Sequence, residues 1–361
     1  MTRNDSLTLR QMLALTFVCL LSPAIRLLPR SAAMAGGSGG WLAPILAAPA
    51  AAALAAVLCR LMASRRGSEG LVGVLLRIWG RLPGRAICAA LMLWMVFYTG
   101  ILLRTGAERL LSTVYTGGGP ALFMAVTAAG AGIVSLGRLR SLGRLGEVSV
   151  PAMCGILALV LLLALPDVEP AELLPEPGRE KGVLAASIPV LSVVSKCVFP
   201  LLLTSGLERA ERPLPRALRW LGLLLLILVG ITAATVGAMS ASLTARLQHP
   251  FFVMIRNISV FGIIERIEAV VIALWVIPDL VFAAALLRAE GVLLSAVTGR
   301  TIGRPLHLVF AAGAMICGLA AARDAFSLER LSRELVPAVN LALAFGLMPL
   351  SLLVGRLRRV I

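Results

Sequence analysis

The sequence has few charged side chains: Asp, Glu, Lys and Arg make up 14% of the 361 residues, against about 25% in soluble proteins. Aromatic residues make up only 5%, and the two histidines, His249 and His307, lie far apart. The six cysteines occur singly in apolar stretches with no metal-ligand spacing, which is typical of small buried hydrophobes. We therefore expect no metal site and no cofactor.

Catalytic motifs are also missing from the sequence. It contains no Asp-rich prenyl-diphosphate motif, no HExxH and no GxSxG, so we do not expect an enzyme. The net charge of +16 raises the question of nucleic-acid binding. However, the basic residues lie between apolar spans and lack aromatic interleaving, as in the cytoplasmic loops of membrane proteins. We expect no nucleic-acid partner.

Apolar sequence dominates the chain, with 59% hydrophobic residues and a mean hydropathy of +0.95. A hydrocarbon core of about 30 Å requires roughly 20 apolar residues per helix. Ten segments fit best, which predicts an all-α integral membrane protein forming a single membrane domain over 1–361. The bias of basic residues toward alternate loops predicts that both termini are cytoplasmic. The predicted spans are 9–35, 41–62, 86–103, 120–136, 147–165, 183–205, 217–238, 264–287, 305–322 and 336–355.

The first and sixth spans carry corresponding interruptions. Ser22-Pro23 lies in the middle of the first span, and the sixth contains Lys196 between two prolines. Paired interruptions of this kind indicate two inverted repeats of five helices, here 8–165 and 183–357, with a binding site where they meet. Half-helix ends leave backbone groups free to hold a zwitterion or an ion, although a simple proline kink packed in protein is the alternative.

Acidic residues occupy one face of the eighth span. Glu265, Glu268, Trp275 and Asp279 follow one another at helical spacing. Carboxyl groups within a span cost several kcal/mol unless they face protein or water, so this helix is predicted to be an inner one. Glu265 and Glu268 either pair locally at the outer end or act in gating or proton coupling. Asp279, the third candidate for coupling or gating, either faces a pocket or approaches the cytoplasmic end.

Several further side chains are candidates for binding a ligand. Lys196 needs a partner or a cavity at its depth, and Asp279 and Glu268 are the expected partners. Arg26 either binds a ligand carboxylate or extends to the outer headgroups. The remaining candidates either line the site or pack and hydrogen-bond between helices; with Lys196, the predicted ligand-binding set is Ser22, Pro23, Ala24, Tyr98, Ser192, Ser195 and Trp275.

Four stretches resemble one known family: LTLRQMLALTF, LLSPAIRLLPRSAAMAGGSGGWLAPILAA, ELLPEPG and HPFFVMIRNISVFGIIERIEAVVIALWVIPDLVF. They are similar to the spore germination permeases, the B subunits of nutrient germinant receptors in the amino acid-polyamine-organocation superfamily. ERIEA followed by Trp275 is the most specific piece.

The resemblance implies a LeuT-like fold of ten helices in two inverted repeats, with helices 1 and 6 broken. It also implies recognition of a small nutrient, an amino acid or a sugar, in the inner membrane of the spore. The implied partners are further receptor subunits: a membrane protein with a soluble domain and a lipoprotein. A proton-coupled amino acid permease is the alternative function.

Overall fold

The computed structural model describes residues 6–113, 119–208, 211–257 and 267–361; for 112–113 and 267–274 only the backbone is described. Within these residues, seven helical stretches are long and apolar enough to cross a membrane. The first stretch, Leu9–Ala63, contains two helices. Two further apolar helices, Pro120–Leu136 and Leu306–Ala321, are shorter. The described residues therefore contain ten crossing segments, as the sequence predicts, and the chain is a multi-pass, all-α membrane protein.

The crossings follow one another in the order in which the sequence predicts them. They are α1 (Leu9–Gly36), α2 (Ala43–Ala63), α4 (Arg81–Thr113), α5 (Pro120–Leu136), α6 (Leu139–Ala164), the segment of α7 (Glu180–Ala185), α8 (Ser187–Ser195) and α9 (Val198–Leu201), then α10 (Pro213–Met239), α13 (Ile267–Thr298), α14 (Leu306–Ala321) and the segment of α15 (Ala325–Arg330), α16 (Val336–Leu341) and α17 (Met348–Leu357). Within the last crossing, η6 (Leu331–Leu335) and η7 (Ala342–Leu347) join its three helices. Shorter elements connect the crossings: η2 (Gly37–Leu42), α3 (Leu71–Trp79), η3 (Leu165–Asp167), η4 (Pro170–Leu173), η5 (Thr204–Gly206), α11 (Ala241–Arg246) and α12 (Pro250–Asn257).

Helix α1 differs from the broken helix that its prolines predict. It is helical without interruption from Leu9 to Gly36, with Pro23 and Pro29 inside it. Each proline lacks the N–H that would bond four residues back, so the carbonyls of Cys19 and Ile25 lose their helical donors. The helix tolerates this loss because most of its length is buried against neighbouring helices.

The sixth crossing is interrupted, as predicted. Helix α8 ends at Ser195, a turn at Lys196 and Cys197 follows, and α9 continues for only four residues from Val198. The backbone N–H of Lys196 bonds three residues back, to the carbonyl of Val193, at 3.2 Å. This turn lies inside the bundle, because Lys196 is only 2% exposed.

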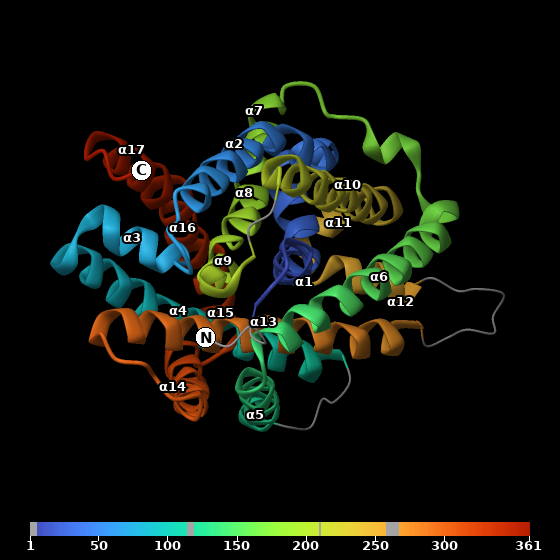
Figure 1. Ribbon diagram of the computed structural model, residues 1–361. Helices are drawn as coiled ribbons and strands as arrows, with labels where there is room; N and C mark the ends of the chain where they lie inside the picture. The colour runs from blue at the N-terminus through green and yellow to red at the C-terminus, as the bar shows by residue number, and fades with distance from the viewer. Residues whose placement is uncertain (1–5, 114–118, 209–210, 258–266) are drawn as a thin grey trace.

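Helices α4 and α13 cross the bundle at a steep tilt. They contain 33 and 32 residues, or about 50 Å at 1.5 Å per residue, which exceeds the hydrocarbon thickness of about 30 Å. In Figure 1 both run across the view, whereas α1, α5 and α14 are seen nearly end-on. Helix α4 also lies against α14, where a Cβ on Gly100 would be 2.4 Å from the carbonyl oxygen of Ala314. Glycine is required for this approach.

Both ends of the described chain lie on one face of the bundle. Leu7 pairs with Leu207 through backbone hydrogen bonds, and Arg65 donates to the Leu207 carbonyl at 2.7 Å. Arg77 of α3, which follows the same loop, donates to the carbonyl of Val360 at 3.3 Å. An even number of crossings also places both chain ends on the same face. That this shared face is the cytoplasmic one stays a prediction.

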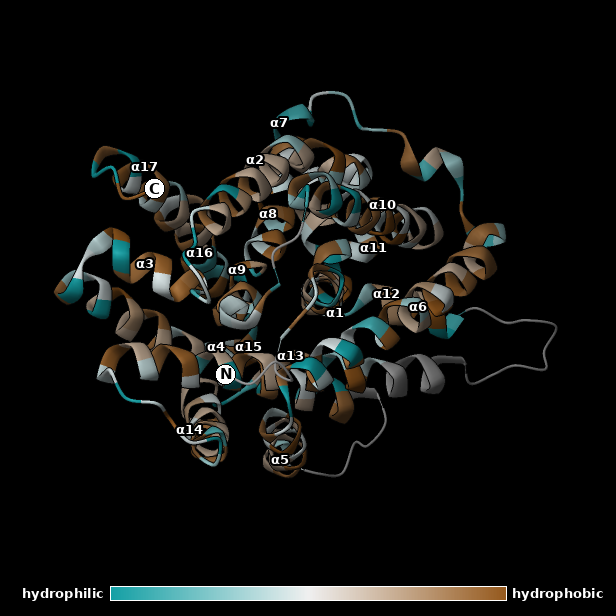
Figure 2. Cartoon of the chain, in the orientation of Figure 1, coloured by the Kyte–Doolittle hydropathy of each residue, from teal (hydrophilic) through white to brown (hydrophobic). Residues whose placement is uncertain are grey.

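The opposite face is formed by η2, η4 and the short helices α7, α11 and α12. The Trp41 indole donates to the Leu173 carbonyl at 3.0 Å, and the Ser38 hydroxyl donates to the Leu174 carbonyl at 2.6 Å. In Figure 2 the crossing helices are mostly hydrophobic, while α7 is hydrophilic. We refer to this side as the α11–α12 face.

Candidate functional site

Asp279 lies where helices α1, α4 and α13 meet. It is 5% exposed, and its Oδ2 is 2.7 Å from Nη2 of Arg109 in α4. Its Oδ1 accepts a hydrogen bond from the hydroxyl of Ser22 in α1. Helix α13 continues from Asp279 to Thr298, about five more turns. Asp279 therefore faces the protein interior and lies far from the end of its helix.

Sequence reasoning missed Arg109 because the predicted third span ended at residue 103. Helix α4 instead continues to Thr113, which brings Arg104 and Arg109 into the bundle at 4% and 1% exposure. Glu108 pairs with Arg104 one turn away, at 2.6 Å. That charge pair at helical spacing was the available sign that the helix goes on.

Arg26 lies one turn after Ser22 on α1 and is only 3% exposed, so it does not extend to the headgroups. Its Nε and Nη1 have no hydrogen-bond partner among the described residues. Asp279, Arg109 and Tyr98 are within its electrostatic reach. A buried guanidinium with two free donors matches the planar geometry of a carboxylate.

Trp275 lies one turn before Asp279 on α13 and is 1% exposed, with no hydrogen-bond partner at Nε1. Its ring packs edge-on against Phe252 of α12, with centroids 6.1 Å apart, and Phe252 in turn packs against His249 at 6.3 Å. Burial lowers the pKa of His249 to about 4, so its imidazole is neutral at physiological pH. These rings close the region toward the α11–α12 face.

Helices α1 and α13 run in opposite directions across the bundle. α1 starts at the face where Leu7 pairs with Leu207, whereas α13 ends near that face, with Gly299 beside Arg85. The residue one turn after Ser22 and the residue one turn before Asp279 therefore lie on the same side of the Ser22–Asp279 contact. Arg26 and Trp275, which both carry donors without a partner among the described residues, therefore lie at a similar depth in the bundle.

Lys196 and Tyr98 form another wall of this region. The Nζ of Lys196 is 6.0 Å from the centroid of the Tyr98 ring, which also packs against Phe199 at 5.3 Å and Phe282 at 5.9 Å. The predicted ion pair between Lys196 and Asp279 is absent, because Arg109 reaches Asp279 from α4. No acidic side chain among the described residues contacts Lys196.

The predicted serines and their neighbours do not form one cluster. The Ser195 hydroxyl donates to the backbone carbonyl of Ser192 in its own helix, at 2.6 Å. Ser192 lines a separate cavity of about 360 Å³ together with Ser31 of α1. Pro23 and Ala24 are buried beside Ser22 in the continuous helix α1.

Two of the predicted gating acids, Glu265 and Glu268, have side chains that the structure does not describe. Glu265 falls outside the described residues. Glu268 belongs to α13, but its side chain is not described, so its pairing with Lys196 and its gating role stay predictions.

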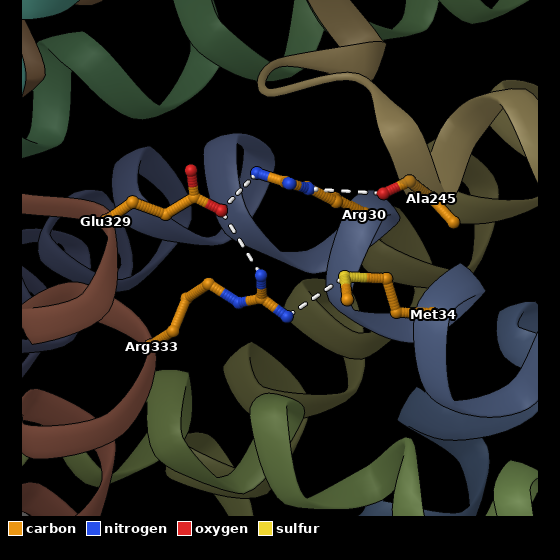
Figure 3. A network of polar contacts seen from close by, with 5 residues as sticks. All are labelled: Arg30, Met34, Ala245, Glu329 and Arg333. Atoms are coloured by element: carbon orange, nitrogen blue, oxygen red, sulfur yellow. Dashed lines mark hydrogen bonds and ion pairs between the residues drawn. The ribbon is translucent and has the colours of Figure 1, made fainter. Parts of the chain in front are cut away.

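A cluster of charged side chains joins α1 to the last crossing near the α11–α12 face (Figure 3). Nη1 of Arg30, one turn beyond Arg26, is 2.6 Å from Oε1 of Glu329, which also lies 3.2 Å from Nη1 of Arg333. Arg30 donates to the carbonyl of Ala245 in α11 at 3.2 Å. The outer half of α1 is thereby tied to two other elements.

The fold and the sequence both have counterparts among known proteins. The family model of the spore germination proteins matches residues 6–289. No curated protein matches the sequence. Among solved structures, the chain is similar to Mhp1, a nucleobase-cation-symport-1 family transporter in a closed conformation with bromovinylhydantoin bound.

The Mhp1 match has a TM-score of 0.67 and 16% sequence identity, and it covers 97% of this chain and 78% of that chain. At this identity the likeness shows a common transporter fold. The predicted LeuT-like architecture is thereby confirmed. Since the family model spans most of the sequence, the chain belongs to the spore germination protein family of permease-like membrane proteins.

Proposed function

We propose that this chain is the permease-like subunit of a spore nutrient receptor and that it binds a small carboxylate-bearing nutrient between α1, α4, α8–α9 and α13. Arg26 carries the proposal. It is a buried guanidinium whose Nε and Nη1 have no acceptor among the described residues. A buried charge without a partner is costly, so a ligand that supplies acceptors here gains affinity.

The charges of the region favour an anionic group in the ligand. Asp279 is paired with Arg109, and Arg26 and Lys196 are two further buried cations in the described part. A ligand carboxylate would balance one of these cations, and Trp275 Nε1 offers a further donor. A ligand that carries a carboxylate, such as an amino acid, is therefore favoured over a neutral sugar.

Signalling would follow from the connection of Arg26 to the outer cluster. Arg30 lies one turn further along α1 and is tied to Glu329. A ligand held by Arg26 would favour one position of α1 over others, and receptor subunits in contact with this chain would respond to that position. The proposed partners are a membrane protein with a soluble domain and a lipoprotein, in the inner membrane of the spore.

A proton-coupled amino acid permease is the second candidate function. Its support is the fold shared with a transporter and a buried acid, Glu290, in α13. The two functions differ in whether the purified chain accumulates its ligand.

The test begins with equilibrium binding of radiolabelled amino acids to the purified full-length chain in lipid nanodiscs. At least one should bind saturably, and Arg26→Gln should weaken that binding roughly ten- to a hundredfold, as expected for loss of charge-assisted hydrogen bonds. Arg26→Lys should restore part of it. Arg10→Gln is the matched control, because Arg10 is in the same helix with a side chain that is 81% exposed. Equal affinities for wild type and Arg26→Gln would overturn the assigned site.

Uptake into liposomes with and without a proton gradient then separates the two functions. Binding without accumulation supports the receptor subunit, whereas gradient-driven accumulation supports the permease. Co-purification of the two proposed subunits with the chain tests the partners, and their absence from such preparations would contradict the receptor assembly.

A further inference from the structure

We propose that Glu290 is a proton-binding site of this chain, holding its proton through the contact with Thr99 between α13 and α4. The inference does not depend on the ligand proposed above. Glu290 is 0% exposed and lies three turns beyond Asp279 on α13. Sequence analysis missed it because the predicted eighth span ended at residue 287.

The hydrogen bonds of Thr99 indicate where the proton lies. Its Oγ1 is 2.8 Å from the carbonyl oxygen of Met95 and 2.7 Å from Oε1 of Glu290. A hydroxyl has one proton to donate, and both neighbours are acceptors if Glu290 is ionised. Both contacts are satisfied when Thr99 donates to Met95 and a protonated Glu290 donates to Thr99. A neutral carboxylic acid therefore fits this arrangement.

The surroundings of Glu290 also favour the neutral form. Its Oε2 has no hydrogen-bond partner in the described part of the chain, where an ionised carboxylate would need donors at both oxygens. No charged side chain among the described residues pairs with it or acts on it electrostatically. Several charged groups on the elements packed against α13 have other contacts: Arg104 with Glu108, Arg109 with Asp279, Arg77 with Glu69, and His307 with the Ser135 carbonyl. Arg26 of α1 is near Asp279, three turns along α13 from Glu290. On α13 itself, Arg288 donates to the carbonyls of Ser135 and Gly137; α5 and α9 carry no charged residue.

The next residue of the helix borders a cavity. Gly291 lines this cavity of about 150 Å³ together with Ser205, Ser295 and Arg304, near the face that holds both chain ends. A proton that leaves Glu290 leaves behind a buried carboxylate with no counter-charge among the described residues. The contact between α4 and α13 must then rearrange to solvate it, so occupancy of the site is linked to conformation.

Infrared difference spectroscopy on the purified full-length chain in nanodiscs tests the proposal, with the proton itself as the probe. At neutral pH the wild type should show the C=O stretching band of a protonated carboxyl group, and Glu290→Gln should remove it. Thr99→Val should shift the band to higher frequency, because the acid loses its acceptor. Glu334→Gln is the matched control and should leave the band in place, because the Glu334 side chain is 69% exposed and ion-paired with Arg330.

Two results would overturn the inference. One is a neutral-pH spectrum of Glu290→Gln that keeps the protonated-carboxyl band of the wild type. The other is a wild-type spectrum without that band. Glutamine has nearly the shape of glutamic acid and the Thr99→Val variant keeps Glu290 itself, so folding of at least one variant is expected and can be checked by size-exclusion chromatography.

Discussion

Replacing Asp279 by asparagine should destabilise the protein strongly. The carboxylate lies 2.7 Å from Arg109, and the two side chains are 7% and 1% exposed. Removing one partner of such a buried pair costs about 3–5 kcal/mol, because the charge of the other partner stays buried without compensation. Here the loss also removes the acid among the described residues that lies within electrostatic reach of Arg26. The upper half of that range is therefore expected for the free energy of unfolding.

A double-mutant cycle measures the coupling directly. Asp279→Asn, Arg109→Gln and their combination would be compared by denaturant titration in lipid–detergent micelles, followed by tryptophan fluorescence. The double variant should be more stable than the sum of the two single losses predicts, by about 2 kcal/mol or more, because it leaves no unpaired charge between these positions. Arg330→Gln is the control: Arg330 and Glu334 are 79% and 69% exposed, and such pairs contribute about 0–1 kcal/mol.

Additive losses in this cycle would refute the reasoning. They would mean that Asp279 and Arg109 do not compensate one another, and that the charge balance used to assign the ligand's carboxylate is wrong.

Three further changes have defined outcomes. Gly100→Ala should destabilise the chain by several kcal/mol in the same titration, on the order of an overpacked core site, because the new Cβ would meet the Ala314 carbonyl at 2.4 Å; an unchanged midpoint would contradict the close packing of α4 on α14. Asp324 caps α15 by accepting a hydrogen bond from the Ser327 N–H, which holds the pKa of Asp324 below the ordinary value of 3.8. The ionised cap therefore stabilises the fold above that pH, and this contribution is lost as the pH falls through the lowered pKa. Asp324→Ala should flatten that part of the stability–pH curve, and an unaltered curve would count against the cap. Glu329→Gln should increase thiol labelling of a cysteine placed at Trp275 from the α11–α12 face, because it releases the outer half of α1; unchanged labelling rates would show that the cluster does not restrict access.

The sequence predicts the ten crossings well because long apolar runs and proline positions are local properties. The interruption around Lys196 and the inward position of Asp279 follow from the same reasoning. The partner of Asp279 could not be predicted. A window of roughly 20 apolar residues fits an upright helix, whereas α4 and α13 are steeply tilted and continue beyond their predicted ends. Arg109 and Glu290 lie in those extensions.

The continuity of α1 shows a second limit of sequence reasoning. Proline removes one hydrogen bond, and whether the helix then breaks depends on its neighbours. α1 is enclosed along most of its length and stays helical, while the sixth crossing breaks at Lys196. Similar sequence signals therefore gave different backbones.

The backbone pairing of Leu7 with the chain near Leu207 disfavours opening of the bundle at the face that holds both chain ends. The Leu7 N–H donates to the Gly206 carbonyl at 2.8 Å, and its carbonyl accepts from Glu208 at 2.9 Å. These bonds join the start of α1 to the end of the sixth crossing. Two such bonds contribute about 1–3 kcal/mol. Because opening the bundle by separating these crossings breaks both bonds, the population of that open state is reduced roughly ten- to a hundredfold.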